Sequence, residues 1–210
     1  MAKLSTAELK GLSAKLIEAL SAAQISALDS SQIQALSAKH IQSMTTNQVK
    51  DLTTGDLKEF SAKQVAAFSA DQLNSLGTKI SALSTESIVA LTAKQINGLS
   101  SESIKNLSTE QAAAITNKQL AGLTSDNIKG FEADDLAKLS TAALKGLSAK
   151  LMDSLSSAQF NALGSDQVQA LTAKHIQALS TAQVANLTTG DIKEFSAKQV
   201  AAFSADQLNS

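Results

Sequence analysis

The sequence predicts an all-α solenoid of very short helices, with one helix in each eight-residue repeat and three helices in each turn of a triangular prism. Three observations predict this fold class. A large apolar residue recurs every eight residues, a helix-start signal recurs with the same period, and the 210 residues include no proline. A short period that runs along a whole chain is typical of stacked repeat architectures.

The first position of the repeat carries the recurring apolar residue. It runs from Leu4 to Leu76 and from Leu83 to Phe203 in steps of eight, with a single seven-residue step between Leu76 and Leu83. The resulting 26 units follow the pattern L-[S/T]-x-x-Q-[I/L/V]-x-[A/G/S/N], as residues 20–27, LSAAQISA, show. This regularity predicts one continuous array.

Positions two to six of the repeat form a helix-start signal. The second position is Ser or Thr in 22 units, and the other four units have Asp29, Gly77, Glu132 and Gly164. Ser, Thr, Asp and Gly are preferred N-cap residues, so only Glu132 is a clear exception. The fifth position is Gln or Glu in 14 units, which completes a capping box, and the apolar first and sixth positions form a hydrophobic staple.

A start signal every eight residues excludes one long helix. Eight residues at about 100° each rotate an apolar stripe by about 80°, so no fixed apolar face survives. A strand is excluded because its apolar positions would fall on opposite faces. We therefore expect helices of five or six residues joined by corners. The small eighth position, as in Gly11, Gly98 and Asn106, is expected to allow close approach and left-handed backbone at helix ends.

The size of the helix favours three helices per turn. A six-residue helix is about 9 Å long, and three such edges enclose a triangle that two apolar side chains per edge can fill. Four edges would leave a void, which close packing disfavours. We expect about 24 residues per turn and a spacing between turns of about 8–10 Å. A looser superhelix of helix–helix corners is the alternative.

The octads are themselves arranged in a longer repeat. Residues 4–75 align with 139–210 without a gap, 54 of these 72 positions are identical, and 58–75 matches 193–210 completely. We predict a single repeat array over 1–210, in which 4–138 is one long repeat of seventeen octads and 139–210 is about half of a second copy. We expect the chain to be an excerpt of a longer array.

Composition argues against several classes of protein. The chain has 18 basic and 19 acidic residues spread along its length, so we expect no nucleic acid partner. It has no apolar run of about 18 residues, so we expect no membrane insertion. The first residues lack a charged segment followed by an apolar stretch, so we expect no signal peptide in this chain. The absence of cysteine excludes disulfides and thiolate metal sites.

No group of residues predicts a reaction. His40 and His175 replace the Gln of the capping box, and we interpret them as cap substitutes because no second His or Cys lies nearby to complete a metal site. Phe60 and Phe68 occupy the apolar first position and are expected in the core. Calcium loops and Gly-rich phosphate loops are absent. The sequence thus predicts no catalytic, cofactor-binding or metal-binding residue, and no enzyme.

The remaining positions are expected to be exposed. The third, fourth and seventh positions carry Lys, Glu, Asp and Thr with no consistent sign, which is typical of a solvated face. The terminal units, 4–11 and 203–210, have ordinary repeat sequence. Because solenoids usually need polar caps, we expect end-to-end self-association through uncovered apolar side chains.

The octads LSAAQISA (20–27) and LTAKQING (91–98) resemble the L-T-T-A-Q-[IV]-x-A arrays of very large bacterial surface and secreted proteins. They also resemble the short-helix repeats of the toblerone fold, a triangular helical prism. The resemblance covers nearly the whole chain, and LGTKISA (76–82) departs from it. It implies the outside or the surface of a bacterial cell. We therefore expect a non-catalytic structural spacer or stalk, and the alternative is a protein- or glycan-binding module that uses an exposed repeat face.

Overall fold

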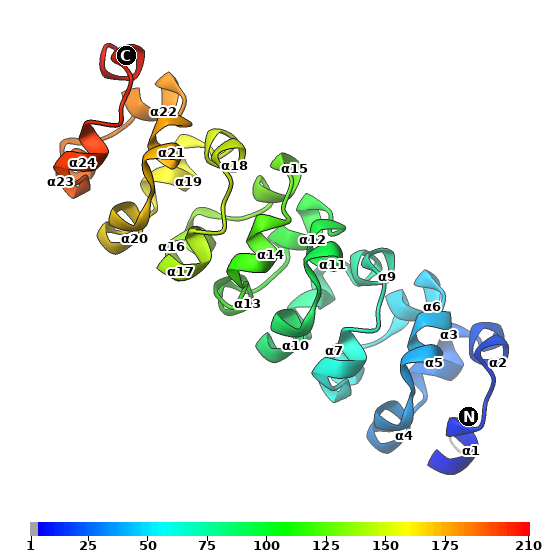
Figure 1. Ribbon diagram of the computed structural model, residues 1–210. Coiled ribbons are helices and arrows are strands. Elements are labelled where there is room, and N and C mark those ends of the chain that lie inside the picture. Colours follow the sequence, from blue (N-terminus) through cyan, green and yellow to red (C-terminus); the bar gives the residue numbers. More distant parts are fainter. Residues whose placement is uncertain (1–3) are drawn as a thin grey trace.

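The computed structural model describes residues 4–210 and is an elongated stack of short helices (Figure 1). Over these residues it contains 25 α-helices and one 3-10 helix, η1, and no strand. In chain order the helices are α1 (Thr6–Lys10), α2 (Ala14–Ala19), α3 (Ala22–Ser26), α4 (Ser30–Ala35), α5 (Ala38–Ser43), α6 (Thr46–Asp51), α7 (Thr54–Glu59), α8 (Ala62–Val65), α9 (Ala70–Ser75), η1 (Gly77–Ala82), α10 (Thr85–Ala90), α11 (Ala93–Asn97), α12 (Ser101–Lys105), α13 (Thr109–Ala113), α14 (Asn117–Ala121), α15 (Ser125–Ile128), α16 (Ala133–Lys138), α17 (Thr141–Leu144), α18 (Ala149–Asp153), α19 (Ser157–Asn161), α20 (Ser165–Ala170), α21 (Ala173–Gln177), α22 (Thr181–Ala185), α23 (Thr189–Glu194), α24 (Ala197–Val200) and α25 (Ala205–Leu208).

The helices begin at the predicted N-caps. In α3 the Ser21 hydroxyl accepts from the N–H of Gln24 at 3.2 Å, and the Gln24 side-chain oxygen accepts from the N–H of Ser21 at 2.8 Å. Leu20 and Ser21 both have extended backbone, with ψ angles of 145° and 154°. Helices of four to six residues are unstable alone, so they depend on these caps and on their neighbours.

The expectation of left-handed backbone at the ends of the helices was wrong. Gly11, Gly98 and Asn106 end their helices with φ between −79° and −82°. In residues 4–210 only Gly77 has a positive φ, at 56°. The chain turns instead through the extended residues that come after each helix. The expectation of close approach holds at Gly98, the eighth residue of its unit. A Cβ added there would lie 2.5 Å from the Cβ of Ala70, so a larger residue would not fit.

Three helices make one turn of the solenoid, as predicted. Nearly every helix packs against the third element after it along the chain, as α3 packs on α6 and α6 on α9. The same relation joins helices along the whole elongated stack (Figure 1). This arrangement confirms the predicted solenoid.

The core runs as one hydrophobic cluster through the stack. It is filled from the first and sixth positions of the repeat. Sixth-position residues such as Ile17, Ile41 and Ile88 are fully buried. Phe60 and Phe68 lie in this core as expected, with their rings edge to face and their centroids 5.4 Å apart. The staple residues therefore form the interior of the prism.

The seven-residue unit is absorbed without a break in the stack. It forms η1, which has no side-chain cap and follows Leu76 through the left-handed Gly77. Since η1 packs on α7 before it and on α12 after it, the stacking order of three is kept. The Lys79 ammonium donates to the carbonyl of Leu52 at 2.7 Å, in the turn before.

Candidate functional site

The Gln of the repeat ties each turn to the one before it. In α6 the Gln48 side-chain oxygen accepts from the N–H of its own N-cap, Thr45, at 2.7 Å. Its amide nitrogen donates to the carbonyls of Leu20 at 2.7 Å and Ile17 at 2.8 Å. These two carbonyls belong to the corner that lies one turn earlier. Gln48 is buried, so the tie lies inside the wall of the prism.

The same tie recurs along the chain. A Gln amide donates to carbonyls 28 and 31 residues earlier from Gln64, Gln72, Gln111, Gln119, Gln159, Gln167, Gln183, Gln199 and Gln207. Sequence reasoning assigned these residues to capping boxes alone. The preference for Gln over Glu was the available signal, because only the amide accepts at one end and donates at the other.

The two histidines make the same connections as Gln. The Nδ1 atom of His40 accepts from the N–H of Ser37 at 3.3 Å, and its Nε2 atom lies 2.9 Å from the carbonyl oxygen of Leu12. His175 has matching contacts with Thr172 and Leu147. The interpretation as cap substitutes is confirmed, and both ring nitrogens are occupied. Among residues 4–210, no three His, Asp or Glu side chains are grouped as a metal ion would require.

Asp135 is a buried carboxyl at the Gln position. One of its oxygens accepts from the N–H of Glu132 at 3.0 Å, and the residue is only 3% exposed. Burial raises the pKa of this carboxyl above its ordinary value, although the bonds from the Glu132 N–H and the Thr109 hydroxyl oppose part of the rise. An ionised carboxylate cannot donate. The ionised Asp135 therefore accepts from the Thr109 hydroxyl of the preceding turn, but it cannot donate to the carbonyls of that turn as Gln does.

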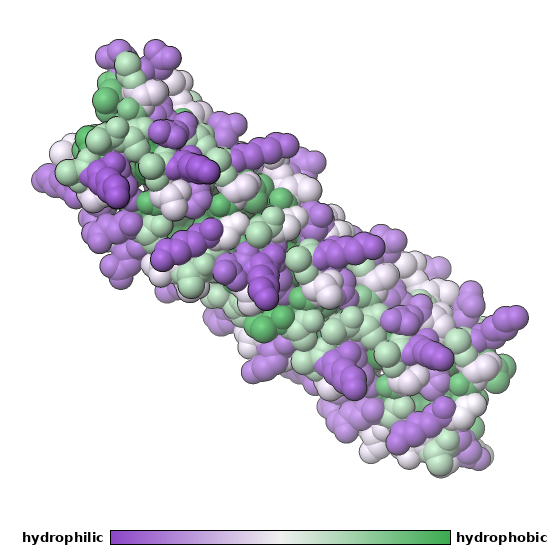
Figure 2. Space-filling view, in the orientation of Figure 1, coloured by the Kyte–Doolittle hydropathy of each residue, from purple (hydrophilic) through white to green (hydrophobic). Residues whose placement is uncertain are grey.

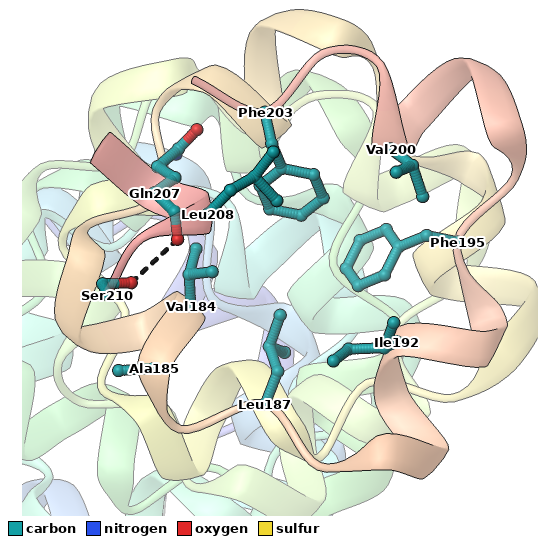
Figure 3. A pocket seen from close by; sticks show the side chains of 10 residues that line it. All are labelled: Val184, Ala185, Leu187, Ile192, Phe195, Val200, Phe203, Gln207, Leu208 and Ser210. Carbon is teal, nitrogen blue, oxygen red and sulfur yellow. Dashed lines mark hydrogen bonds between the residues drawn. The ribbon is translucent and has the colours of Figure 1, made fainter. Parts of the chain in front are cut away.

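The last turn of the chain exposes part of the core layer (Figure 3). Ile192, Val200 and Leu208 are at the sixth position of the last three units, and they are 54%, 41% and 62% exposed. Together with Phe195 and Phe203 they line a hollow at this end. Sixth-position side chains thus point toward the following turn. End-to-end self-association stays a prediction, and this layer is where we expect it to act.

The exposed charges are ordered along one side of the prism. Helices α2, α5, α8, α10, α13 and α16 pack one on the next, and we call this part of the stack the charged column. The same stack continues through α19, α22 and α25, whose fourth positions are Ala158, Ala182 and Asp206. The fourth repeat position in the helices of the charged column carries, in order, Lys15, Lys39, Lys63, Glu86, Glu110 and Asp134. All six are exposed. The sequence interpretation of unordered signs fails here, because three units per turn place residues 24 apart next to each other.

The two long repeats display equivalent side chains on different sides. One long repeat has seventeen units, which is one unit short of six full turns of three. Equivalent residues of the second copy therefore lie on the neighbouring side of the prism. Lys150, Lys174 and Lys198 are the counterparts of the first three lysines. They lie in α18, α21 and α24, which stack in another column. Figure 2 shows hydrophilic side chains along the whole visible face, with paler and apolar side chains between them.

Comparison with known families supports a repeat protein. The model of the ALTTAQ repeat matches residues 1–38 and 128–164. None of the curated proteins compared matches the chain. No helix in residues 4–210 has the length and hydrophobicity needed to cross a bilayer. The chain is therefore a repeat protein of short helices with similarity to ALTTAQ repeats in two stretches.

Proposed function

We propose that this chain is a stiff, non-catalytic spacer or stalk segment of a large bacterial surface or secreted protein. The observation that carries the proposal is the stacking with three elements per turn, which continues across η1 because α7 packs on η1, η1 on α12, and α8 on α10. A solenoid of this kind grows in length with each added repeat, because a repeat contacts only its neighbours. Similarity to ALTTAQ repeats supports a structural role.

The ties between turns supply the stiffness. A Gln amide such as that of Gln119 holds two carbonyls of the preceding turn, those of Ile88 at 2.8 Å and Leu91 at 2.8 Å. Bending the rod at such a corner would separate buried polar groups from their partners, which costs about 1–3 kcal/mol for each group. The octads resemble the short-helix repeats of the toblerone type, and this resemblance of sequence supports a location at the bacterial cell surface or outside the cell as part of the proposal.

The decisive experiment measures length against repeat number by small-angle scattering. We compare the 210-residue chain with a chain that carries one further 135-residue unit. At about 8–10 Å per turn, the added unit should lengthen the rod by roughly 45–55 Å. A radius of gyration that grows only as a weak power of chain length, as in globular domains, would contradict the spacer.

A second candidate function is an interaction module, and the ordered charges of the charged column favour it. A binding stripe along the whole rod is disfavoured, because equivalent residues of the two long repeats lie on different sides of the prism. The identical stretch 58–75 tests this candidate through its exposed Lys58 and Lys63 and the half-buried Glu59. Substitution of these three residues should abolish a partner's binding if the stretch is a recognition site, and should leave binding unchanged if it is not.

A further inference from the structure

We propose that two copies of this chain pair side by side and antiparallel along the charged column. This inference goes beyond the spacer role and does not depend on it. The three lysines occupy the half of the column nearer the N-terminus, and the three acidic residues occupy the other half. When a second copy is rotated by a half-turn, its acidic half therefore faces the basic half of the first copy.

The spacing of the charges fits a twofold axis between Lys63 and Glu86. Successive charges are 24, 24, 23, 24 and 24 residues apart, so the series reads the same from either end. With the axis at its centre, Lys63 faces the partner's Glu86, Lys39 faces the partner's Glu110, and Lys15 faces the partner's Asp134. The contact is isologous, so each pair occurs twice and the assembly closes as a dimer.

None of the six charges has an ion-pair partner within residues 4–210, where the one ion pair joins Lys129 to Asp126. The seventh-position neighbours of the four central charges are uncharged, namely Gln42, Ala66, Val89 and Ala113. Only the outer members have charged neighbours, Glu18 beside Lys15, and Glu132 and Lys138 beside Asp134. The carboxylates of Glu86 and Glu110 do accept hydrogen bonds at their own helix starts, from Ser84 and Ser108. The central charges therefore lack a charged partner within the described residues, and a second copy can supply one.

The middle of the column also permits close contact. Val89 is 48% exposed, which is unusual for an apolar residue of this chain, and it lies three residues after Glu86 on the same helix. Residues three apart on a helix are surface neighbours. Ala66 stands in the corresponding place after Lys63. A half-turn about the proposed axis brings Val89 towards the partner's Ala66, which covers exposed apolar surface.

Another column provides a contrast within the same molecule. Helices α12, α15, α18, α21 and α24 carry Glu102, Asp126, Lys150, Lys174 and Lys198 at the fourth position. Here Lys105 and Lys129 follow the two acidic residues by three positions, and Lys129 is 3.2 Å from Asp126. Each acidic residue of this column thus has a lysine three positions after it, and the lysine after Asp126 forms an ion pair with it. We therefore expect no pairing along this column.

The association should be weak and sensitive to salt. Exposed ion pairs contribute little individually, and salt screens them. We would measure sedimentation of the 210-residue chain at about 20 mM and about 500 mM salt, where the Debye length lies above and below about 10 Å. A Leu208→Glu background suppresses stacking through the ends. We expect a monomer–dimer equilibrium at low salt and monomer at high salt.

Charge reversal tests the pairing itself. Lys39→Glu or Glu110→Lys should each weaken the dimer by at least tenfold in dissociation constant, and the double variant should restore it. Lys174→Glu is the matched control, because Lys174 is the counterpart of Lys39 in the second long repeat. A circular-dichroism spectrum confirms that each variant is folded. A monomer at low salt, or equal loss with Lys174→Glu, would overturn the proposal.

Cross-linking tests the antiparallel orientation. The chain contains no cysteine, so introduced thiols report only their own contacts. A mixture of Lys39→Cys and Glu110→Cys chains should form a disulfide-linked dimer under mild oxidation. Each variant alone should cross-link far more slowly. Preferential cross-linking of Lys39→Cys with itself would indicate a parallel pair and would overturn the antiparallel arrangement, while leaving the spacer function untouched.

Discussion

Residues 58–75 and 193–210 have the same sequence but different surroundings. Val65 is fully buried, whereas its counterpart Val200 is 41% exposed, and Leu73 is fully buried, whereas Leu208 is 62% exposed. The ties to the preceding turn are the same, since Gln64 and Gln199 each donate to carbonyls 28 and 31 residues earlier. The Phe pairs are alike too, with ring centroids 5.4 and 5.3 Å apart.

The comparison shows that each unit has a direction. Its Gln bonds toward the preceding turn, and those contacts are complete in both copies. Its sixth-position side chain points toward the following turn and is buried only where that turn is present. A unit therefore folds onto the preceding turn and provides the apolar surface on which the next turn packs.

The largest expected difference in stability between the two copies comes from substitution of the sixth-position residue. Val65→Asp places an unpaired charge in the core and should destabilise the protein by about 4 kcal/mol or more. Val200→Asp should cost about 1 kcal/mol or less, because water reaches this side chain. Urea denaturation of the 210-residue chain measures both. Equal effects would mean that the direction of the unit has been misassigned.

Loss of the tie should affect the two copies in different ways. Gln64→Ala removes two buried bonds and leaves the carbonyl of Leu36 without its donor in the middle of the stack, whereas the carbonyl of Ile33 still accepts from the N–H of Leu36. The loss should cost about 1–3 kcal/mol of global stability. Gln199→Ala removes equivalent bonds near the end, so it should instead speed hydrogen exchange locally in residues 187–210. Unchanged stability in Gln64→Ala would show that the tie contributes little.

A smaller effect is expected at Asp135, just before the second copy begins. Its pKa is raised by burial, so the protonated form stabilises the fold at low pH, and that stability is lost as pH rises through the folded pKa. Asn127 already fills the same position, donating to the carbonyl of Leu99 at 2.6 Å. Asp135→Asn should therefore gain about 1 kcal/mol at pH 7.

The pH profile provides the control for this substitution. Stability of the unchanged protein should decline above about pH 4, the ordinary range of an Asp carboxyl, and the Asp135→Asn variant should lack that component of the decline. Thermal melts between pH 3 and pH 8 would measure the difference. Parallel profiles in the two proteins would show that Asp135 does not titrate in this way.

The smallest effect concerns the exposed positions of the two copies. Asp71→Ala and Asp206→Ala should each change stability by no more than about 0.5 kcal/mol, as substitutions at exposed sites usually do. Both residues are exposed. Denaturation curves that differ by more than this between the two variants would indicate a contact of Asp71 with the neighbouring turns.

Local signals in the sequence determined the helices and the core. An N-cap such as Ser21 and a box residue such as Gln24 act within one unit, so their effect can be predicted from spacing alone. The apolar first and sixth positions predicted the core for the same reason. The N–H of Glu132, the one clear exception among the caps, is satisfied by Asp135.

The size of the helix favoured three helices per turn, but only the tertiary structure decided which side chains of neighbouring turns meet. The tie from Gln48 to Leu20, the alignment of Lys39 with Lys63, and the displacement of the second copy all depend on three helices per turn. The octad does not encode that number directly, because it depends on how many edges the core side chains can fill without a void. The backbone conformation of the corners was also decided there, since the extended Leu and Ser after each helix make the turn that a left-handed residue was expected to make.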